Sequence, residues 1–179
     1  MSPRHAARGS TLIEVLIALL VACVGLLAMA RLSAAAIGHQ KSAQLRLTGL
    51  TLAQQYAEHA RLNVYGFDLG QYAIALGDTP PTAPTLDPEA GDLSAAQALA
   101  QFDRAAFLRA VGNALPEGRA LVASHADPTG RDLDIWLLWR DVPLDPADSL
   151  AAANAQQCPT NLSSADRNGA RCMHFKVGL

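Results

Sequence analysis

One acidic side chain lies inside the most apolar stretch of the chain, and its position calls for a chemical explanation. Leu12 to Ala30 is a run of 19 residues in which Glu14 is the single charged residue. The run is close to the ~20 residues that a helix needs to cross a bilayer. An unpaired carboxylate in an apolar medium is unfavourable. Glu14 therefore predicts a cationic partner within the same apolar surroundings.

The residues that precede Glu14 form a specific string, because residues 9–15 read GSTLIEV. This string resembles the processing site of type IV pilins and pseudopilins. The resemblance implies that prepilin peptidase removes residues 1–9 by cutting between Gly9 and Ser10, and that the new amino terminus is N-methylated. It also implies that Glu14, fifth in the mature chain, neutralises the α-amino group of Ser10 on a neighbouring subunit, since a paired buried charge is tolerated better than an isolated one.

An ordinary secretory signal peptide is the alternative for the same stretch. Arg4 and Arg8 would form its basic region, the apolar run its hydrophobic region, and residues 28–30 (AMA) its cleavage site. That alternative has to explain Glu14 and the GSTLIEV string. The two hypotheses differ in the mature amino terminus, which is Ser10 for a pilin and Arg31 for a secreted binding domain.

The helix is expected to continue beyond the apolar run. Proline is absent between Pro3 and Pro80, and residues 31–63 are rich in the good helix formers Ala, Leu, Gln and Arg. Leu45, Leu52 and Tyr56 form one apolar stripe on this second half. We therefore expect a leader at 1–9, a transmembrane and filament-core half at 10–30, an amphipathic half at 31–63 and a head at 64–179. Helix-weakening glycines predict bending along the helix at three positions: Gly25, Gly38 and Gly49.

The head is expected to be a short antiparallel sheet packed on the long helix, which makes the fold class α+β. Residues 64–93 are rich in glycine and proline and predict an irregular connection. A short helix should follow, with Ser94 and Gln97 as a capping box and an apolar face that includes Leu108 and Val111. Alternating patterns predict strands at 119–124, 133–140 and 172–177.

Further motifs narrow the resemblance to the PilV group of minor pilins. They are VGLL at 24–27, the leucine, proline and glycine of residues 115–118, the pair Trp139-Arg140, and the loop between Cys158 and Cys172. This resemblance implies insertion in the inner membrane with the head in the periplasm. It then implies a complex with other pilins, linked to a tip adhesin, that primes or caps the type IV pilus and serves adhesion, twitching and DNA uptake. A type II secretion pseudopilin shares the first stretch and is the alternative.

The cysteines fit this compartment. Cys158 and Cys172 have 13 residues between them and could pair in an oxidising environment, which would stabilise the loop by ~3 kcal/mol. A metal pair is the alternative, but no second Cys/His pair at ligand spacing accompanies it. Cys23 reads as a small hydrophobic residue of the apolar run.

The sequence predicts no catalytic residue, cofactor or metal. Nucleotide loops, nucleophile elbows and zinc-protease motifs are absent, and the five histidines lack ligand spacing. Asp132 and Asp134 read as solvated carboxylates, since no Ca²⁺ ligand loop surrounds them. Residues 64–179 carry 8 basic and 14 acidic side chains, which does not favour binding of nucleic acid. Trp136 and Trp139 should lie on opposite sheet faces, and an exposed Trp136 could anchor a partner.

Overall fold

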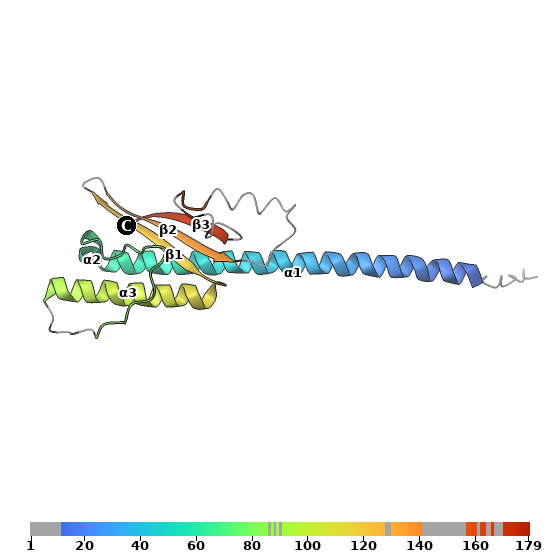
Figure 1. The fold of residues 1–179 in the computed structure, drawn as a ribbon, viewed down its shortest axis with the longest axis horizontal. Coiled ribbons are helices and arrows are strands. Elements are labelled where there is room, and N and C mark those ends of the chain that lie inside the picture. Colours follow the sequence, from blue (N-terminus) through green and yellow to red (C-terminus); the bar gives the residue numbers. More distant parts are fainter. Residues whose placement is uncertain are drawn as a thin grey trace, which may run out of the picture. The chain divides into compact units, whose positions relative to one another are not determined.

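The structure is a computed structural model, and it confirms the α+β type IV pilin fold (Figure 1). It describes residues 12–85, 87, 89, 91–127, 130–140, 157–160, 162–163, 166 and 170–179. Its elements are α1 (Leu12–Leu62), α2 (Val64–Asp68), α3 (Asp92–Ala114), β1 (Arg119–Asp127), β2 (Gly130–Arg140) and β3 (Ala170–Gly178). The chain divides into two compact units, residues 1–41 and 42–179, with α1 running through the boundary.

The three strands form one antiparallel sheet in the order β1-β2-β3. All three predicted strands are confirmed, and each is longer than the alternating pattern indicated. The inward face of β2 carries Leu133, Ile135, Leu137 and Trp139, each no more than 1% exposed. On β3, Met173, Phe175 and Val177 pack against the same core. The alternating pattern that predicted these two strands therefore corresponds to one face packed against the core.

Within residues 42–179, the second half of α1 lies between the sheet and α3 (Figure 1). Tyr56 of α1 stacks on Phe107 of α3 with ring centroids 4.3 Å apart. On the opposite side, Gly49 of α1 approaches the sheet so closely that a Cβ there would stand 2.8 Å from Met173 Cε and 3.3 Å from Leu137 Cδ1. The sequence predicted only that Gly49 weakens the helix, whereas in the structure its lack of a side chain allows close contact between helix and sheet.

The expectation of an irregular connection at 64–93 is wrong in two places. Residues 64–68 form α2, and Phe67 within it is fully buried. Further on, Ile74 pairs with Val122 of β1 through two backbone hydrogen bonds of 3.0 and 2.9 Å. Burial of apolar side chains therefore orders a segment whose glycines and prolines suggested only a loop.

The helix predicted from Ser94 is longer than expected and begins earlier. It is α3, with 23 residues, and Gly91 is its N-cap residue. The Ser94 hydroxyl donates to the Gly91 carbonyl at 2.9 Å, so the predicted capping box is wrong. The predicted apolar face is confirmed, because Leu108, Val111 and Leu115 are all buried.

Candidate functional site

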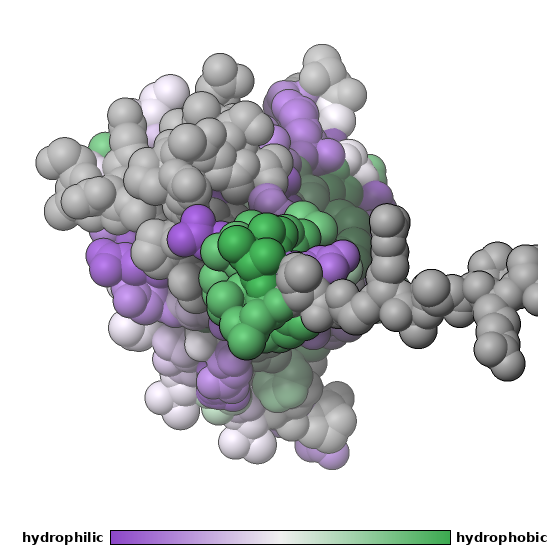
Figure 2. Space-filling model, turned by 90° about the vertical axis from the view of Figure 1, so that its right-hand side faces the viewer, coloured by the Kyte–Doolittle hydropathy of each residue, from purple (hydrophilic) through white to green (hydrophobic). Residues whose placement is uncertain are grey.

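The first part of α1 presents an apolar surface without internal cover. We call residues 12–37 the apolar segment, and every one of them is exposed. Large hydrophobic side chains are 49–81% exposed from Leu12 to Met29. Figure 2, which looks toward the amino end of α1, shows a green, hydrophobic area at this end of the helix. An apolar surface of this extent marks a site of contact with a membrane or with other protein.

Among the described residues, α1 is the one helix that is long and apolar enough to cross a membrane. Its apolar window lies near the amino terminus, and none of that window is buried. A buried core helix of a soluble protein would instead have most of this surface covered. Cys23 lies on the same surface as an exposed, unbridged thiol, as expected for a small hydrophobic residue there.

Glu14 lies in the first described turn of α1. A carboxylate at the amino end of a helix interacts favourably with the positive end of the helix dipole. Ile13, Val15 and Leu16 around it are at least 49% exposed, so its surroundings on the helix are apolar. Gly9 and Ser10, the predicted processing residues, lie outside the described residues. Their pairing with Glu14 therefore stays a prediction.

The predicted disulfide between Cys158 and Cys172 is present. Cys172 is 1% exposed and lies on the sheet face that points away from α1, where it packs with Leu138 and Leu162. The disulfide thus ties the segment before β3 to the outer face of the sheet. Burial of Leu162 covers that face at one end.

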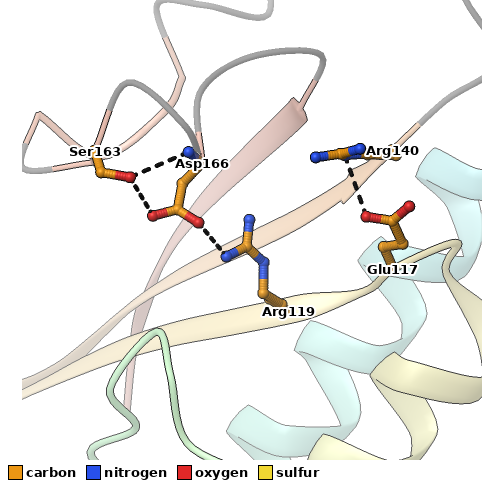
Figure 3. Close-up of polar contacts among 5 residues, drawn as sticks. All are labelled: Glu117, Arg119, Arg140, Ser163 and Asp166. Carbon is orange, nitrogen blue, oxygen red and sulfur yellow. Dashed lines mark hydrogen bonds and ion pairs between the residues drawn. The ribbon is translucent and has the colours of Figure 1, made fainter.

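Two ion pairs hold the same region (Figure 3). Asp166 accepts a hydrogen bond from Arg119 of β1 and another from Ser163. Both partners lower the pKa of the Asp166 carboxyl below its usual value, with the Ser163 hydrogen bond as the larger cause. At the end of β2, Arg140 pairs with Glu117 at 3.1 Å. The first pair fastens the disulfide segment to the start of β1, and the second joins the end of β2 to the residues just before β1.

The two tryptophans lie on opposite faces of the sheet, as the sequence predicted. Trp139 is 1% exposed and belongs to the core. Trp136, on the opposite face, is half-buried and stacks on His174 with ring centroids 4.4 Å apart. Trp136 is therefore partly covered by its own sheet, and its role as an anchor for a partner stays a prediction.

A polar network inside the head was missed by sequence reasoning. The Tyr72 hydroxyl donates to Asp103 Oδ2 at 2.7 Å, and His59 Nδ1 lies 3.0 Å from Asp103 Oδ1. Burial, followed by the hydrogen bond to Asp103, raises the pKa of Tyr72 well above its usual value. The available signal was Asp103 itself, an acid on the otherwise apolar face of α3 between Ala100 and Phe107. The network joins α1, α3 and the segment between them.

Comparison with known proteins supports the reading of the amino terminus. Residues 4–30 match the model of the prokaryotic N-terminal methylation motif. No curated protein and no solved structure matches the chain. The matched range includes Gly9, Ser10 and Glu14, and it overlaps the apolar segment over residues 12–30.

The motif and the fold together define the class of protein. The motif is the signal of type IV prepilin-like proteins, and the long helix with a three-stranded antiparallel sheet is the corresponding architecture. The chain thus combines a type IV prepilin-like motif at its amino end with a long helix and a three-stranded sheet, and this motif implies processing by prepilin peptidase. The apolar α1 fits anchoring in the inner membrane before assembly.

Proposed function

We propose that this protein is a minor pilin of the PilV group. Prepilin peptidase cuts it between Gly9 and Ser10, and Ser10 is then N-methylated. Residues 10–30 hold it in the inner membrane with the head in the periplasm. It then joins other minor pilins, and this complex primes or caps the type IV pilus, carries a tip adhesin and supports adhesion, twitching and DNA uptake.

One observation supports a pilin role: the apolar segment is exposed throughout, while residues 42–179 form a compact unit with its own buried core. The narrower PilV assignment depends on the sequence motifs at 24–27, 115–118 and 139–140. Exposure of this much apolar area to water is unfavourable, so the segment partitions into an apolar environment. A bilayer offers such a medium to the single subunit, and the helices of other pilins offer it within a filament. The same surface would therefore contact lipid in the single subunit and the helices of other pilins in the filament.

Glu14 would make packing in the filament specific for one arrangement of neighbouring subunits. In the filament its carboxylate requires a cation, because an isolated charge in an apolar core is strongly unfavourable. The α-amino group of Ser10 on the adjacent subunit supplies that cation. The pair would fix the axial register between subunits, since only one register brings the two charges together.

The test compares two acid-to-alanine variants in the same helix. Glu14→Ala removes the proposed partner of Ser10, whereas Glu58→Ala removes an exposed acid that pairs with Arg61 outside the apolar segment. We expect both variants to be processed normally. Glu14→Ala should enter sheared pili at least about tenfold less, which corresponds to ~1.4 kcal/mol, and Glu58→Ala should enter at the wild-type level. Wild-type incorporation of Glu14→Ala would refute the proposed pairing.

The methylation motif at residues 4–30 is also compatible with a type II secretion pseudopilin, because pseudopilins carry the same kind of amino-terminal motif. Deletion of the protein separates the two functions. A minor pilin predicts loss of surface pili and twitching with secretion intact. Loss of secretion with normal pili would identify the pseudopilin and overturn the PilV assignment.

A further inference from the structure

The face of the sheet that points away from α1 carries a cluster of metal-ligating side chains. Asp132 and Asp134 of β2 alternate with the buried residues and therefore share this outer face. In the strand register, His125 of β1 lies opposite Asp132, and Lys176 of β3 lies opposite Asp134. His174 follows on β3, opposite Trp136. Three strands thus bring two carboxylates and two imidazoles together.

The contacts within this cluster run diagonally across the strands. His125 Nε2 lies 3.4 Å from Asp134 Oδ2, and His174 Nε2 lies 2.8 Å from Asp134 Oδ1. Lys176 Nζ lies 2.8 Å from Asp132 Oδ2. The remaining oxygen, Asp132 Oδ1, is buried and has no hydrogen-bond partner. A buried carboxylate oxygen without a partner is unfavourable, and such an atom in a native structure calls for a ligand or another explanation.

We propose that His125, Asp132 and Asp134 bind a divalent cation of the zinc class. One ligand atom from each of these residues lies within 4.8 Å of the other two. The 3.4 Å between His125 Nε2 and Asp134 Oδ2 equals the spacing of two ligands on a tetrahedral ion with bonds of ~2.0–2.1 Å. His174 holds the other oxygen of Asp134 and orients that carboxylate, as partners of metal ligands commonly do.

Ligand chemistry favours zinc over calcium at this cluster. Calcium takes 6–8 oxygen ligands, whereas the cluster offers one imidazole nitrogen and two carboxylates. Zinc accepts nitrogen and oxygen in fourfold coordination, and three protein ligands leave the fourth position to water. Because His125 is exposed and the two aspartates are partly exposed, solvent reaches the site.

The register also leaves room for an ion. On β1, the residue opposite Asp134 is Ala123, and on β3 the residue opposite Asp132 is Gly178. A Cβ added at Gly178 would meet no atom within 4 Å. Each carboxylate therefore has one cross-strand neighbour with little or no side chain. The ion would join β1 to β2 and stabilise this end of the sheet.

Lys176 provides the most discriminating variant. Its ammonium group neutralises Asp132 and competes with a cation for that carboxylate. Replacing it by the similarly sized neutral Met should tighten binding of the ion by about fivefold, because a repulsive charge is removed from the site. Structural damage to the head would weaken binding, so a gain in affinity reports on the site itself.

The experiment titrates the full, untagged chain in detergent micelles with ZnCl₂ and follows it by calorimetry. We expect one zinc ion to bind at the cluster, with at least about tenfold weaker binding in His125→Asn and in Asp134→Asn. His59→Asn is the matched control, because His59 also lies beside a carboxylate, at 3.0 Å from Asp103, but outside the cluster. Zinc should raise the thermal unfolding midpoint of the wild type and of Lys176→Met, and not that of His125→Asn.

Three results would overturn the proposal. The first is an absence of zinc binding to the wild-type chain whose disulfide and thermal unfolding are normal. The second is zinc binding that keeps the same affinity and stoichiometry in both His125→Asn and Asp134→Asn. Weaker binding in Lys176→Met with an unchanged unfolding midpoint would equally contradict a site at Asp132.

Discussion

Substitution of Gly49 tests how the head is built on α1. The residue is buried, and a Cβ at this position would stand 2.8 Å from Met173 Cε and 3.3 Å from Leu137 Cδ1. Gly to Ala in an open helix normally stabilises by up to ~1 kcal/mol. Overpacking of a filled site costs ~1–3 kcal/mol. The Met173 methyl is the end of a flexible side chain and can move aside, so we expect Gly49→Ala to be close to neutral. The larger Gly49→Leu should destabilise the head by about 2 kcal/mol or more.

The matched control is Gly112 of α3, where a Cβ would meet no atom within 4 Å. Gly112→Ala should stabilise the head by about 0.5 kcal/mol, because the helix gains propensity without a steric contact. The assay is urea unfolding of the chain in detergent micelles, followed by tryptophan fluorescence from buried Trp139. Opposite signs for Gly49→Leu and Gly112→Ala are the expected result.

A double-mutant cycle sharpens the test. Met173 Cε is the nearest atom to the added Cβ, so Met173→Ala should relieve part of the cost of Gly49→Leu. We expect a coupling energy of about 1 kcal/mol between the two substitutions. If Gly49→Leu left the free energy of unfolding unchanged, the close contact between α1 and the sheet would be refuted.

Three further predictions concern the head. Tyr72→Phe should lower the free energy of unfolding by about 2 kcal/mol, measured in urea, because it removes a buried 2.7 Å hydrogen bond to the carboxylate of Asp103. Replacing both disulfide cysteines by serine should cost about 3 kcal/mol in the same assay, since the bridge spans a sequence separation of 14. The hydrogen bond from Arg131 lowers the pKa of Asp68, so this pair contributes stability above the unfolded pKa of ~3.9 that is lost as pH falls through the folded pKa. Asp68→Asn should therefore make the unfolding midpoint less sensitive to pH between about 5 and 2, and an unchanged slope would count against the pair.

Much of this fold follows from patterns that are local in sequence. The apolar run that contains Glu14, the absence of proline up to Pro80 and the alternation around Leu133 each determine an element from neighbouring residues. The pairing of Cys158 with Cys172 needed only a short separation and an oxidising compartment. These predictions held because secondary structure and short loops depend mainly on local propensity and periodicity.

The errors arose where distant residues decide the structure. Ile74 is ordered by pairing with Val122, which lies far along the chain. Gly49 carries no local sign that Met173 will pack against it. The cluster of His125, Asp132 and Asp134 depends on strand register, which places His125 beside Asp134. This register cannot be predicted from the spacing of the histidines. Tertiary contacts and register therefore set the limit of what this sequence predicts by itself.

The central claim is that residues 10–30 remain in the mature protein as its membrane and filament helix. Mass spectrometry of the amino-terminal peptide, taken from pili of cells with active prepilin peptidase, tests it most directly. We expect a peptide that begins at Ser10 and carries one methyl group on its α-amino nitrogen. A mature chain that begins at Arg31, with the apolar run removed, would contradict it.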